Sequence, residues 1–164
     1  MFMTPDGPAL TVAESVQGGD GHQCSAQTRT RVFPGEHDQV SCARRFVTEV
    51  LGSVPVLDDV VLLISELCTN ALLHTASGDS GTFAVTVCPG PSSVRVEVRD
   101  DGSDQIPMPG PPDASAEDGR GLGLVDLIAD RWGHLGDCRS RSVFFELGWE
   151  TADDRDRTVD AQPD

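Results

Sequence analysis

The strongest constraint on the fold is one apolar periodicity in the middle of the chain. Residues 57–75 read LDDVVLLISELCTNALLHT, with apolar side chains at positions 57, 60, 61, 64, 68 and 71. This spacing places the apolar side chains along one side of a helix of about five turns. Because such a stripe is unfavourable in water, we expect this helix to pack against a core formed by the rest of the chain.

Three polar residues recur at every fourth position of the same helix, namely Glu66, Asn70 and His74. At about 100° per residue they fall within an arc of roughly 80°, on the side opposite the apolar stripe. That arc is shared by Leu62, Leu63 and Leu73. Two interpretations remain open. The polar groups point into a lined pocket, or they are capped or exposed side chains of a structural helix.

Length and composition indicate one globular domain. The chain has 164 residues, of which 38% are hydrophobic and 24% are charged, and this is sufficient for a core of its own. The longest apolar run is far shorter than a membrane span, and the N-terminus lacks a basic region followed by an apolar one. We therefore expect a cytoplasmic protein that does not enter a membrane.

The charge balance limits the partners. The formal net charge is −15; residues 1–23 carry −3 and residues 150–164 carry −4, which leaves −8 for residues 24–149. Nucleic acids require clustered Lys and Arg, so direct binding of nucleic acid is not expected. A nucleotide is still compatible with this charge if a divalent cation and backbone N–H groups provide the positive field.

The five cysteines are odd in number and lack the spacing of a zinc site, at positions 24, 42, 68, 88 and 138. Neither a zinc site nor a disulfide framework is expected. Cys42 and Cys68 fall within helical patterns and are predicted to be small core residues.

The rest of the pattern predicts short strands and helices between two polar ends. Residues 1–23 are predicted to be a disordered leader, residues 24–149 the domain, and residues 150–164 an acidic disordered tail. Within the domain we expect, in order, a strand at 28–33, helices at 36–51 and 57–75, strands at 82–88 and 94–99, a helix at 122–131, and a hairpin of 132–135 with 142–149.

This order predicts an α/β fold, a two-layer sandwich of a mixed, mostly antiparallel sheet and three main helices. The segment at 103–118 contains four prolines and four acidic residues and has little apolar content. It is long for a connection without structure of its own, so it is either a functional lid or disordered.

Three short motifs stand in a fixed order along the chain: Glu66-x-x-x-Asn70-x-x-x-His74 on the central helix, Asp100-x-Gly102 at the end of a strand, and Gly119-x-Gly121-x-Gly123 at the start of a helix. Glycines before a helix also occur in dinucleotide-binding sheets, but there they follow a buried parallel strand. Here they follow a polar, proline-rich segment, which excludes that alternative.

Together and in this order, the motifs resemble the ATP-binding domain shared by histidine kinases, type II topoisomerases, mismatch-repair ATPases and the large heat-shock chaperones, which has the Bergerat fold. The resemblance covers residues 24–149. The segments ELCTNALLHT, VRVEVRDDG and GRGLGLVDLIADRWG are most similar to the stand-alone anti-sigma-factor serine kinases of the RsbW and SpoIIAB type.

The resemblance implies ATP and Mg²⁺ as cofactors and a role for each motif. Asn70 would bind Mg²⁺ through its side-chain carbonyl oxygen, and Glu66 would orient or deprotonate the attacking hydroxyl. Asp100 would accept a hydrogen bond from the adenine amino group, and Gly102 would let the backbone approach the purine. Backbone N–H groups at a helix N-terminus would bind the phosphates, in the segment formed by Gly119, Arg120, Gly121, Leu122 and Gly123.

Several positions carry less defined roles. Ser142 lies where relatives often place a hydroxyl residue near the adenine, and Arg120 either reaches a phosphate or points to solvent. No mechanism follows for His74, for which a structural role is the alternative. The larger family has a second glycine two positions after Gly102, where this chain has Asp104, so the conformation of the segment around the ribose stays open.

The function implied by the resemblance is an ATP-dependent serine/threonine protein kinase that binds a sigma factor and phosphorylates its antagonist. The alternative is a non-catalytic switch in which ATP only sets the shape for partner binding, because binding and catalysis share all residues but Glu66. A histidine kinase is disfavoured by the lack of a phosphoacceptor helix pair, and a topoisomerase or chaperone by the lack of a transducer domain. The expected protein partners are the sigma factor, its antagonist or both, and a homodimer is compatible with the resemblance.

Overall fold

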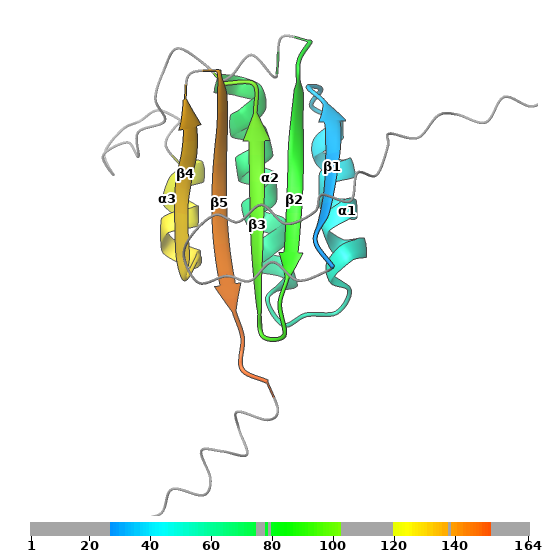
Figure 1. Ribbon diagram of the computed structural model, residues 1–164, viewed down its shortest axis with the longest axis vertical. Helices are drawn as coiled ribbons and strands as arrows, with labels where there is room; N and C mark the ends of the chain where they lie inside the picture. The colour runs from blue at the N-terminus through cyan, green and yellow to red at the C-terminus, as the bar shows by residue number, and fades with distance from the viewer. Residues whose placement is uncertain (1–26, 75–77, 79, 103–119, 138, 152–164) are drawn as a thin grey trace, which may run out of the picture.

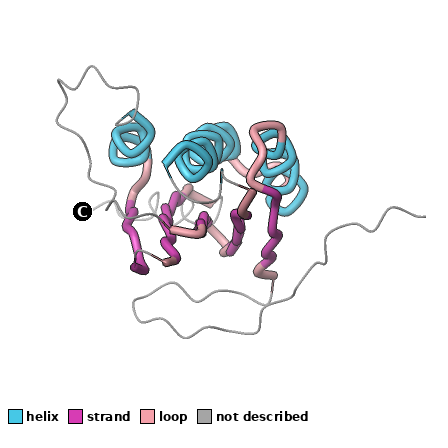
Figure 2. Tube along the Cα trace, turned by 90° about the horizontal axis from the view of Figure 1, so that it is seen from above, coloured by secondary structure: helices cyan, strands magenta, loops and turns pink. Residues whose placement is uncertain are grey.

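Alternating and helical apolar patterns in this chain produce two layers, a sheet and a set of helices (Figure 1). The computed structural model describes residues 27–74, 78, 80–102, 120–137 and 139–151. The described helices all cover the same face of the sheet (Figure 2), and none of them is both long and apolar enough to cross a membrane. The leader at 1–23, the segment at 103–118 and all of the tail after residue 151 lie outside the described residues, so the statements about them stay predictions.

The described elements follow one another in the predicted order. They are β1 (Arg29–Pro34), α1 (Gln39–Leu51), α2 (Leu57–His74), β2 (Thr82–Pro89), β3 (Ser93–Asp100), α3 (Arg120–Ile128), β4 (Arg131–Asp137) and β5 (Ser140–Gly148). The sheet order is β1-β2-β3-β5-β4, and each neighbouring pair is antiparallel. The predicted α/β two-layer fold and both hairpins are confirmed. The described sheet is antiparallel throughout, without the parallel pair that a mixed sheet would contain.

The core lies between α2 and the inner face of the sheet. Along β3, Val94, Val96 and Val98 are buried and alternate with polar residues that are half-buried or exposed, because successive side chains of a strand point to opposite faces. The helix α2 contributes the buried side chains Val60, Leu63, Ile64, Leu67, Cys68, Ala71 and Leu72 to the same hydrophobic cluster. Burial of each large apolar side chain contributes about 1.5–3 kcal/mol, so this contact is a main source of stability.

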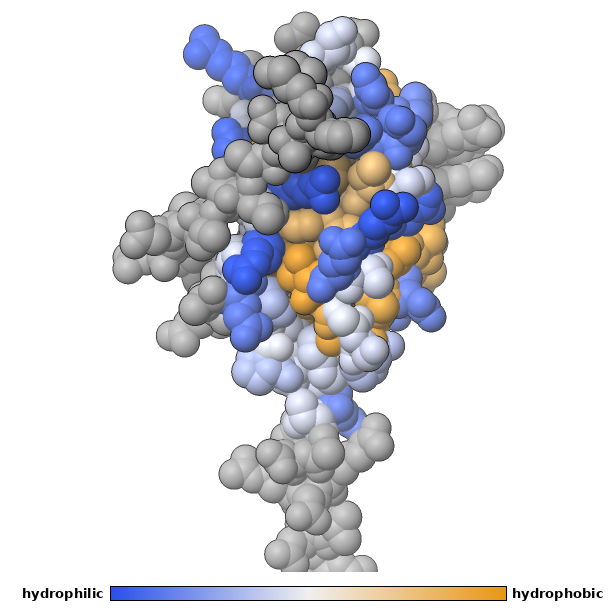
Figure 3. Space-filling model, turned by 90° about the vertical axis from the view of Figure 1, so that its right-hand side faces the viewer, coloured by the Kyte–Doolittle hydropathy of each residue, from blue (hydrophilic) through white to orange (hydrophobic). Residues whose placement is uncertain are grey.

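An aromatic cluster closes the core on the side of β1 and α1. The ring of Phe33 stacks on that of Phe83 at a centroid distance of 5.3 Å and meets the edge of Phe46 at 6.0 Å. The guanidinium of Arg31 lies 5.2 Å from the centroid of the Phe33 ring, a distance suited to a cation–π contact. Figure 3 shows this side of the molecule, where hydrophobic surface remains visible between hydrophilic side chains.

The buried arc of α2 includes most of its apolar stripe and extends past it to Leu63, Leu67 and Leu72. Of the three leucines that share the arc of the polar residues, Leu63 is fully buried, while Leu62 is 40% exposed and Leu73 is 57% exposed. The reason is that α2 lies in the middle of the helical layer, where α1 and α3 contact its flanks (Figure 2).

Glu66 and Asn70 lie on the side of α2 away from the centre of its buried arc. Both side chains are half-buried. In helical projection Asn70 lies next to the buried Leu63, and Glu66 lies nearer to the exposed Leu73.

The sheet face away from the helices carries polar interactions. The Thr30 and Thr86 hydroxyl oxygens lie 2.9 Å apart across β1 and β2. Arg95 donates a hydrogen bond of 2.8 Å to Glu146, and its guanidinium lies 3.7 Å from the centroid of the Phe144 ring. Such cross-strand pairs stabilise an antiparallel sheet whose second face meets solvent.

The prediction that Cys42 and Cys68 are core residues is confirmed. Cys68 is fully buried, and Cys42 packs against the core from a half-buried position. Burial raises the pKa of the Cys68 thiol to about 12, because the thiolate is disfavoured in apolar surroundings. Both are free thiols, as is Cys88.

The packing of α2 gives a stability prediction with a matched control on the same helix. Leu63→Ala removes a fully buried side chain and should lower the free energy of unfolding by about 2–5 kcal/mol. Leu62→Ala changes the adjacent leucine, which is 40% exposed, and should lower the free energy of unfolding by less, about 1 kcal/mol. Urea unfolding followed by circular dichroism measures both, and equal effects would contradict the orientation of α2.

Candidate functional site

The end of β3 forms a tight turn around a buried carboxylate. Asp100 is only 8% exposed, and its Oδ1 accepts a hydrogen bond of 2.7 Å from the backbone N–H of Gly102. Gly102 is itself buried and has a φ of 76°, a conformation that glycine adopts without the steric cost of a Cβ. The adjacent Asp101 accepts a hydrogen bond of 2.8 Å from the backbone N–H of Thr82, which joins the turn to β2.

Asp100 continues the row of buried valines on β3, so it lies on the sheet face that the helices cover. Its partner across β5 is Arg141, whose Nε lies 3.7 Å from Asp100 Oδ1. Burial raises the pKa of Asp100, and the Gly102 N–H and the Arg141 guanidinium oppose that rise. The carboxylate is therefore held in an apolar environment by one backbone donor and one cation.

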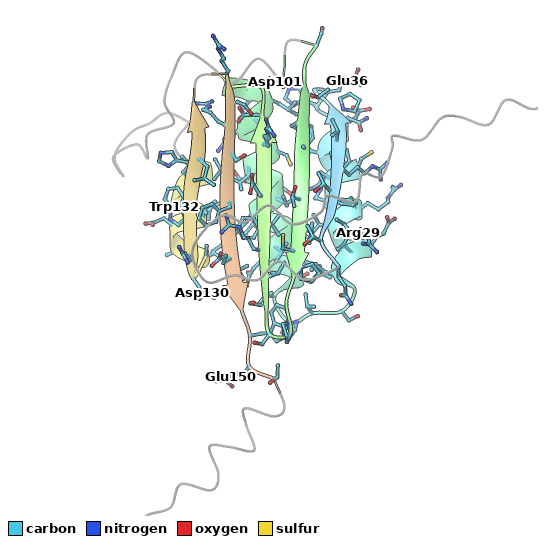
Figure 4. The ribbon with its side chains drawn as sticks, in the orientation of Figure 1. Arg29, Glu36, Asp101, Asp130, Trp132 and Glu150 are labelled. Atoms are coloured by element: carbon cyan, nitrogen blue, oxygen red, sulfur yellow. The ribbon has the colours of Figure 1, made fainter. Side chains whose placement is uncertain are left out.

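The helix α2 brings further polar groups toward the end of the sheet where β3 ends. In Figure 4, Glu36 and Asp101 are labelled at one end and Asp130 at the other. The helix α1 follows Glu36 and runs away from the Asp101 end, so α2 returns toward it (Figure 1). Asn70 lies in the C-terminal half of α2, one turn after Glu66. His74 is the last residue of α2, and its side chain lies outside what the structure describes.

The helix α3 begins at the Asp101 end and is anchored at its other end. Trp132 Nε1 donates a hydrogen bond of 2.9 Å to Asp126, and Asp130 accepts one of 2.7 Å from the backbone N–H of Gly148 (Figure 4). Because Asp130 lies two residues after the end of α3, at the far end of the sheet, the first turn of α3 lies at the end near Asp101. The N-terminus of α3 and the turn after β3 therefore share one end of the molecule.

The glycine motif lies largely inside α3 rather than before it. The helix starts at Arg120, two residues earlier than predicted, so Gly121 and Gly123 belong to its first turns. Leu122 is buried and packs into the core, whereas Gly123 is exposed and an added Cβ there would meet no atom within 4 Å. Gly119 and the side chain of Arg120 lie outside the described part of the chain.

The structure places Ser142 away from the other predicted site residues. Its partners across the sheet are Arg99 on β3 and Leu135 on β4, so Ser142 lies on the face opposite Asp100. The residue that faces Asp100 is Arg141. The expectation of a hydroxyl near the adenine at Ser142 is thus not supported by the strand register. The alternation of inward-facing residues along β5, at 143, 145 and 147, is the signal that identifies position 141 instead.

Residues 33–137 match the family described as the histidine kinase-like ATPase domain, and the match spans more than half of the chain. The chain belongs to this family. A relative of the chain is an uncharacterized protein of Streptomyces coelicolor, 38% identical over 71 residues, which are 43% of this chain and 67% of the relative. Membership in the histidine kinase-like ATPase family implies that the chain binds ATP.

The matched part of this histidine kinase-like ATPase domain contains all three sequence motifs. It covers α2, β3 and α3 and ends at residue 137, before β5. Arg141 and Ser142 therefore lie outside the matched segment. Among the residues that the structure describes, no three His, Cys, Asp or Glu side chains come together as metal ligands.

The raised pKa of Asp100 predicts a pH-dependent stability. A carboxyl whose pKa is higher in the folded state binds its proton more tightly there, so folding loses stability as the pH rises from the ordinary value of 3.8 through the folded-state pKa. The amide side chain of the Asp100→Asn variant cannot ionise, so this variant does not lose stability in this way as the pH rises. The free energy of unfolding of the wild-type protein, minus that of Asp100→Asn, should therefore fall as the pH rises. Urea unfolding at a series of pH values measures this difference, and a constant or rising difference would contradict the burial argument.

Proposed function

We propose that this protein is an ATP-dependent serine/threonine kinase that binds a sigma factor and phosphorylates the antagonist of that factor. The observation that carries the proposal is the position of Glu66. The Glu66 carboxylate lies one turn before Asn70 on α2, and both side chains are half-buried. A carboxylate beside a metal-binding oxygen ligand is suited to phosphoryl transfer, in which positioning and charge neutralisation supply most of the catalysis.

In this proposal the end of β3 holds the adenine. Asp100 is buried, and one of its oxygens accepts the Gly102 N–H. A carboxylate of this kind accepts a hydrogen bond from the adenine amino group, since that group is a donor. The positive φ of Gly102 allows a close approach of the backbone to the purine.

The first turn of α3 would hold the phosphates. Its free N–H groups point out of the helix end, and the helix dipole favours negative charge there. The open space beside Gly123 supports this assignment, because packing gives no reason for a glycine at that position. The binding segment would be Gly119, Arg120, Gly121, Leu122 and Gly123, with Leu122 contributing its backbone while its side chain is buried.

Asn70 would bind Mg²⁺ through its side-chain oxygen. Mg²⁺ prefers oxygen ligands and is usually bound by one or two protein groups together with phosphate oxygens and water, so a single amide on α2 fits this ion. When bound, the ion neutralises charge on the phosphates.

The chemical step assigned to Glu66 is acceptance of a proton. The hydroxyl of a serine or threonine of the partner protein donates its proton to the Glu66 carboxylate while its oxygen forms a bond to the γ-phosphorus. The bond between that phosphorus and the bridging oxygen breaks, and ADP leaves. Phosphoryl transfer requires Glu66, whereas ATP binding alone does not. The other predicted site residues are all assigned to the binding of ATP or Mg²⁺.

Substitutions on neighbouring turns of α2 separate catalysis from binding. Glu66→Gln keeps the size of the side chain but removes its basicity, so ATP affinity should stay within about threefold while phosphoryl transfer falls roughly 10²-fold or more. Asn70→Ala should instead weaken the Mg²⁺-dependent part of ATP binding, because the ion loses a ligand. The measurements are a nucleotide titration and the transfer of labelled γ-phosphate to a partner that co-purifies with the protein.

The same amide substitution at an exposed glutamate of α1, Glu49→Gln, is the control and should change neither quantity. If the wild-type protein binds Mg-ATP but labels no partner, and Glu66→Gln regulates that partner as well as the wild type does, the kinase is excluded. The protein would then be the alternative non-catalytic switch, which uses ATP only to set its shape for partner binding.

A further inference from the structure

Arg141 lies beside the carboxylate that the proposed function assigns to adenine. The antiparallel register places it directly across from Asp100, and antiparallel partners point to the same face of a sheet. Arg141 is only 9% exposed, and its Nε lies 3.7 Å from Asp100 Oδ1. A buried carboxylate and a buried guanidinium therefore stand next to each other at the end of β3.

The neighbour of Arg141 on its other side, on β4, carries no side chain. On β4 the partner of Arg141 is Gly136, which has a φ of 105°. An added Cβ at Gly136 would collide with the carbonyl oxygen of Ser140, so this position requires glycine. Asp100 on β3, Arg141 on β5 and Gly136 on β4 are thus successive partners across the sheet, and the first two carry the polar side chains.

The two groups have opposite hydrogen-bonding character. An ionised carboxylate only accepts hydrogen bonds, whereas a guanidinium only donates them and stays charged at every accessible pH. The edge of adenine presents the complementary pair, a donating N6 amino group next to the accepting ring nitrogen N1. Guanine presents the reverse, an accepting carbonyl next to a donating N1–H.

We propose that Arg141 is a second base-reading residue, which donates a hydrogen bond to adenine N1 while Asp100 accepts one from the N6 amino group. This inference rests on the proposed ATP site and adds a specificity determinant to it. A buried donor of this kind rejects a ligand that lacks the matching acceptor, because the donor is then left without its partner.

The probe for this contact is 1-deaza-ATP, in which a C–H group replaces N1 and all other groups are those of ATP. The wild-type protein should bind 1-deaza-ATP roughly ten- to hundredfold more weakly than ATP, the range expected for the loss of a hydrogen bond to a charged group. Arg141→Met keeps the length of the side chain but removes its donors. It should bind the two nucleotides with affinities that agree within about twofold.

A control nucleotide separates base reading from a positioning role. Purine riboside triphosphate lacks the amino group that Asp100 reads, so both the wild-type protein and Arg141→Met should bind it more weakly than ATP. If Arg141 acted only by orienting Asp100, Arg141→Met would weaken ATP and 1-deaza-ATP by the same factor and leave their ratio as in the wild type. That result would overturn the proposal.

The wild-type titration alone also decides the question if Arg141→Met fails to fold, which circular dichroism would reveal. Equal wild-type affinities for ATP and 1-deaza-ATP overturn the role of Arg141 and leave the proposed function intact. A wild-type protein that binds no ATP overturns the proposed function itself, and the inference with it.

Discussion

The structure depends on the burial of α2 against an antiparallel sheet that carries helices on one face. Seven side chains of α2 join the core, and α1 and α3 contact its flanks. This packing fixes the rotation of the helix and leaves the side chains of Glu66 and Asn70 half-buried, neither sequestered nor fully exposed. The interaction that stabilises the fold thus also positions the polar residues assigned to catalysis and metal binding.

The second constraint is electrostatic and lies at the end of β3. Burying charged groups is costly unless they are paired or hydrogen-bonded. Asp100 and Arg141 are both buried there, with the Gly102 N–H as a further donor. An apolar pair would pack at this position with less cost. Polar groups that are retained against the local packing preference are typical of binding sites, which is why the adenine assignment concentrates on this cluster.

The sequence predicted the architecture because its periodicities are strong. The alternating valines of β3 and the long apolar stripe of α2 specify a half-buried strand and a packed helix without reference to any neighbour. The start of α3 was harder to predict, since glycine has a low helix propensity, and burial of Leu122 and Val125 overrides that propensity. The width of the buried arc of α2 depends on which helices flank it, and no local pattern contains that information. The prediction for Ser142 came from the resemblance alone. The strand register places this residue on the face opposite Asp100, because neighbouring residues of a strand point to opposite faces of the sheet. The domain limits near residues 24 and 149 stay predictions.

The central claim is that the buried cluster at the end of β3 recognises adenine. Calorimetric titration of the full chain with ATP and with GTP, both with Mg²⁺, tests it most directly. The carboxylate of Asp100 would face the guanine carbonyl, so a hydrogen bond is lost and repulsion is gained. ATP should therefore bind at least about tenfold more tightly than GTP. Equal affinities for the two nucleotides, or a preference for GTP, would contradict the claim.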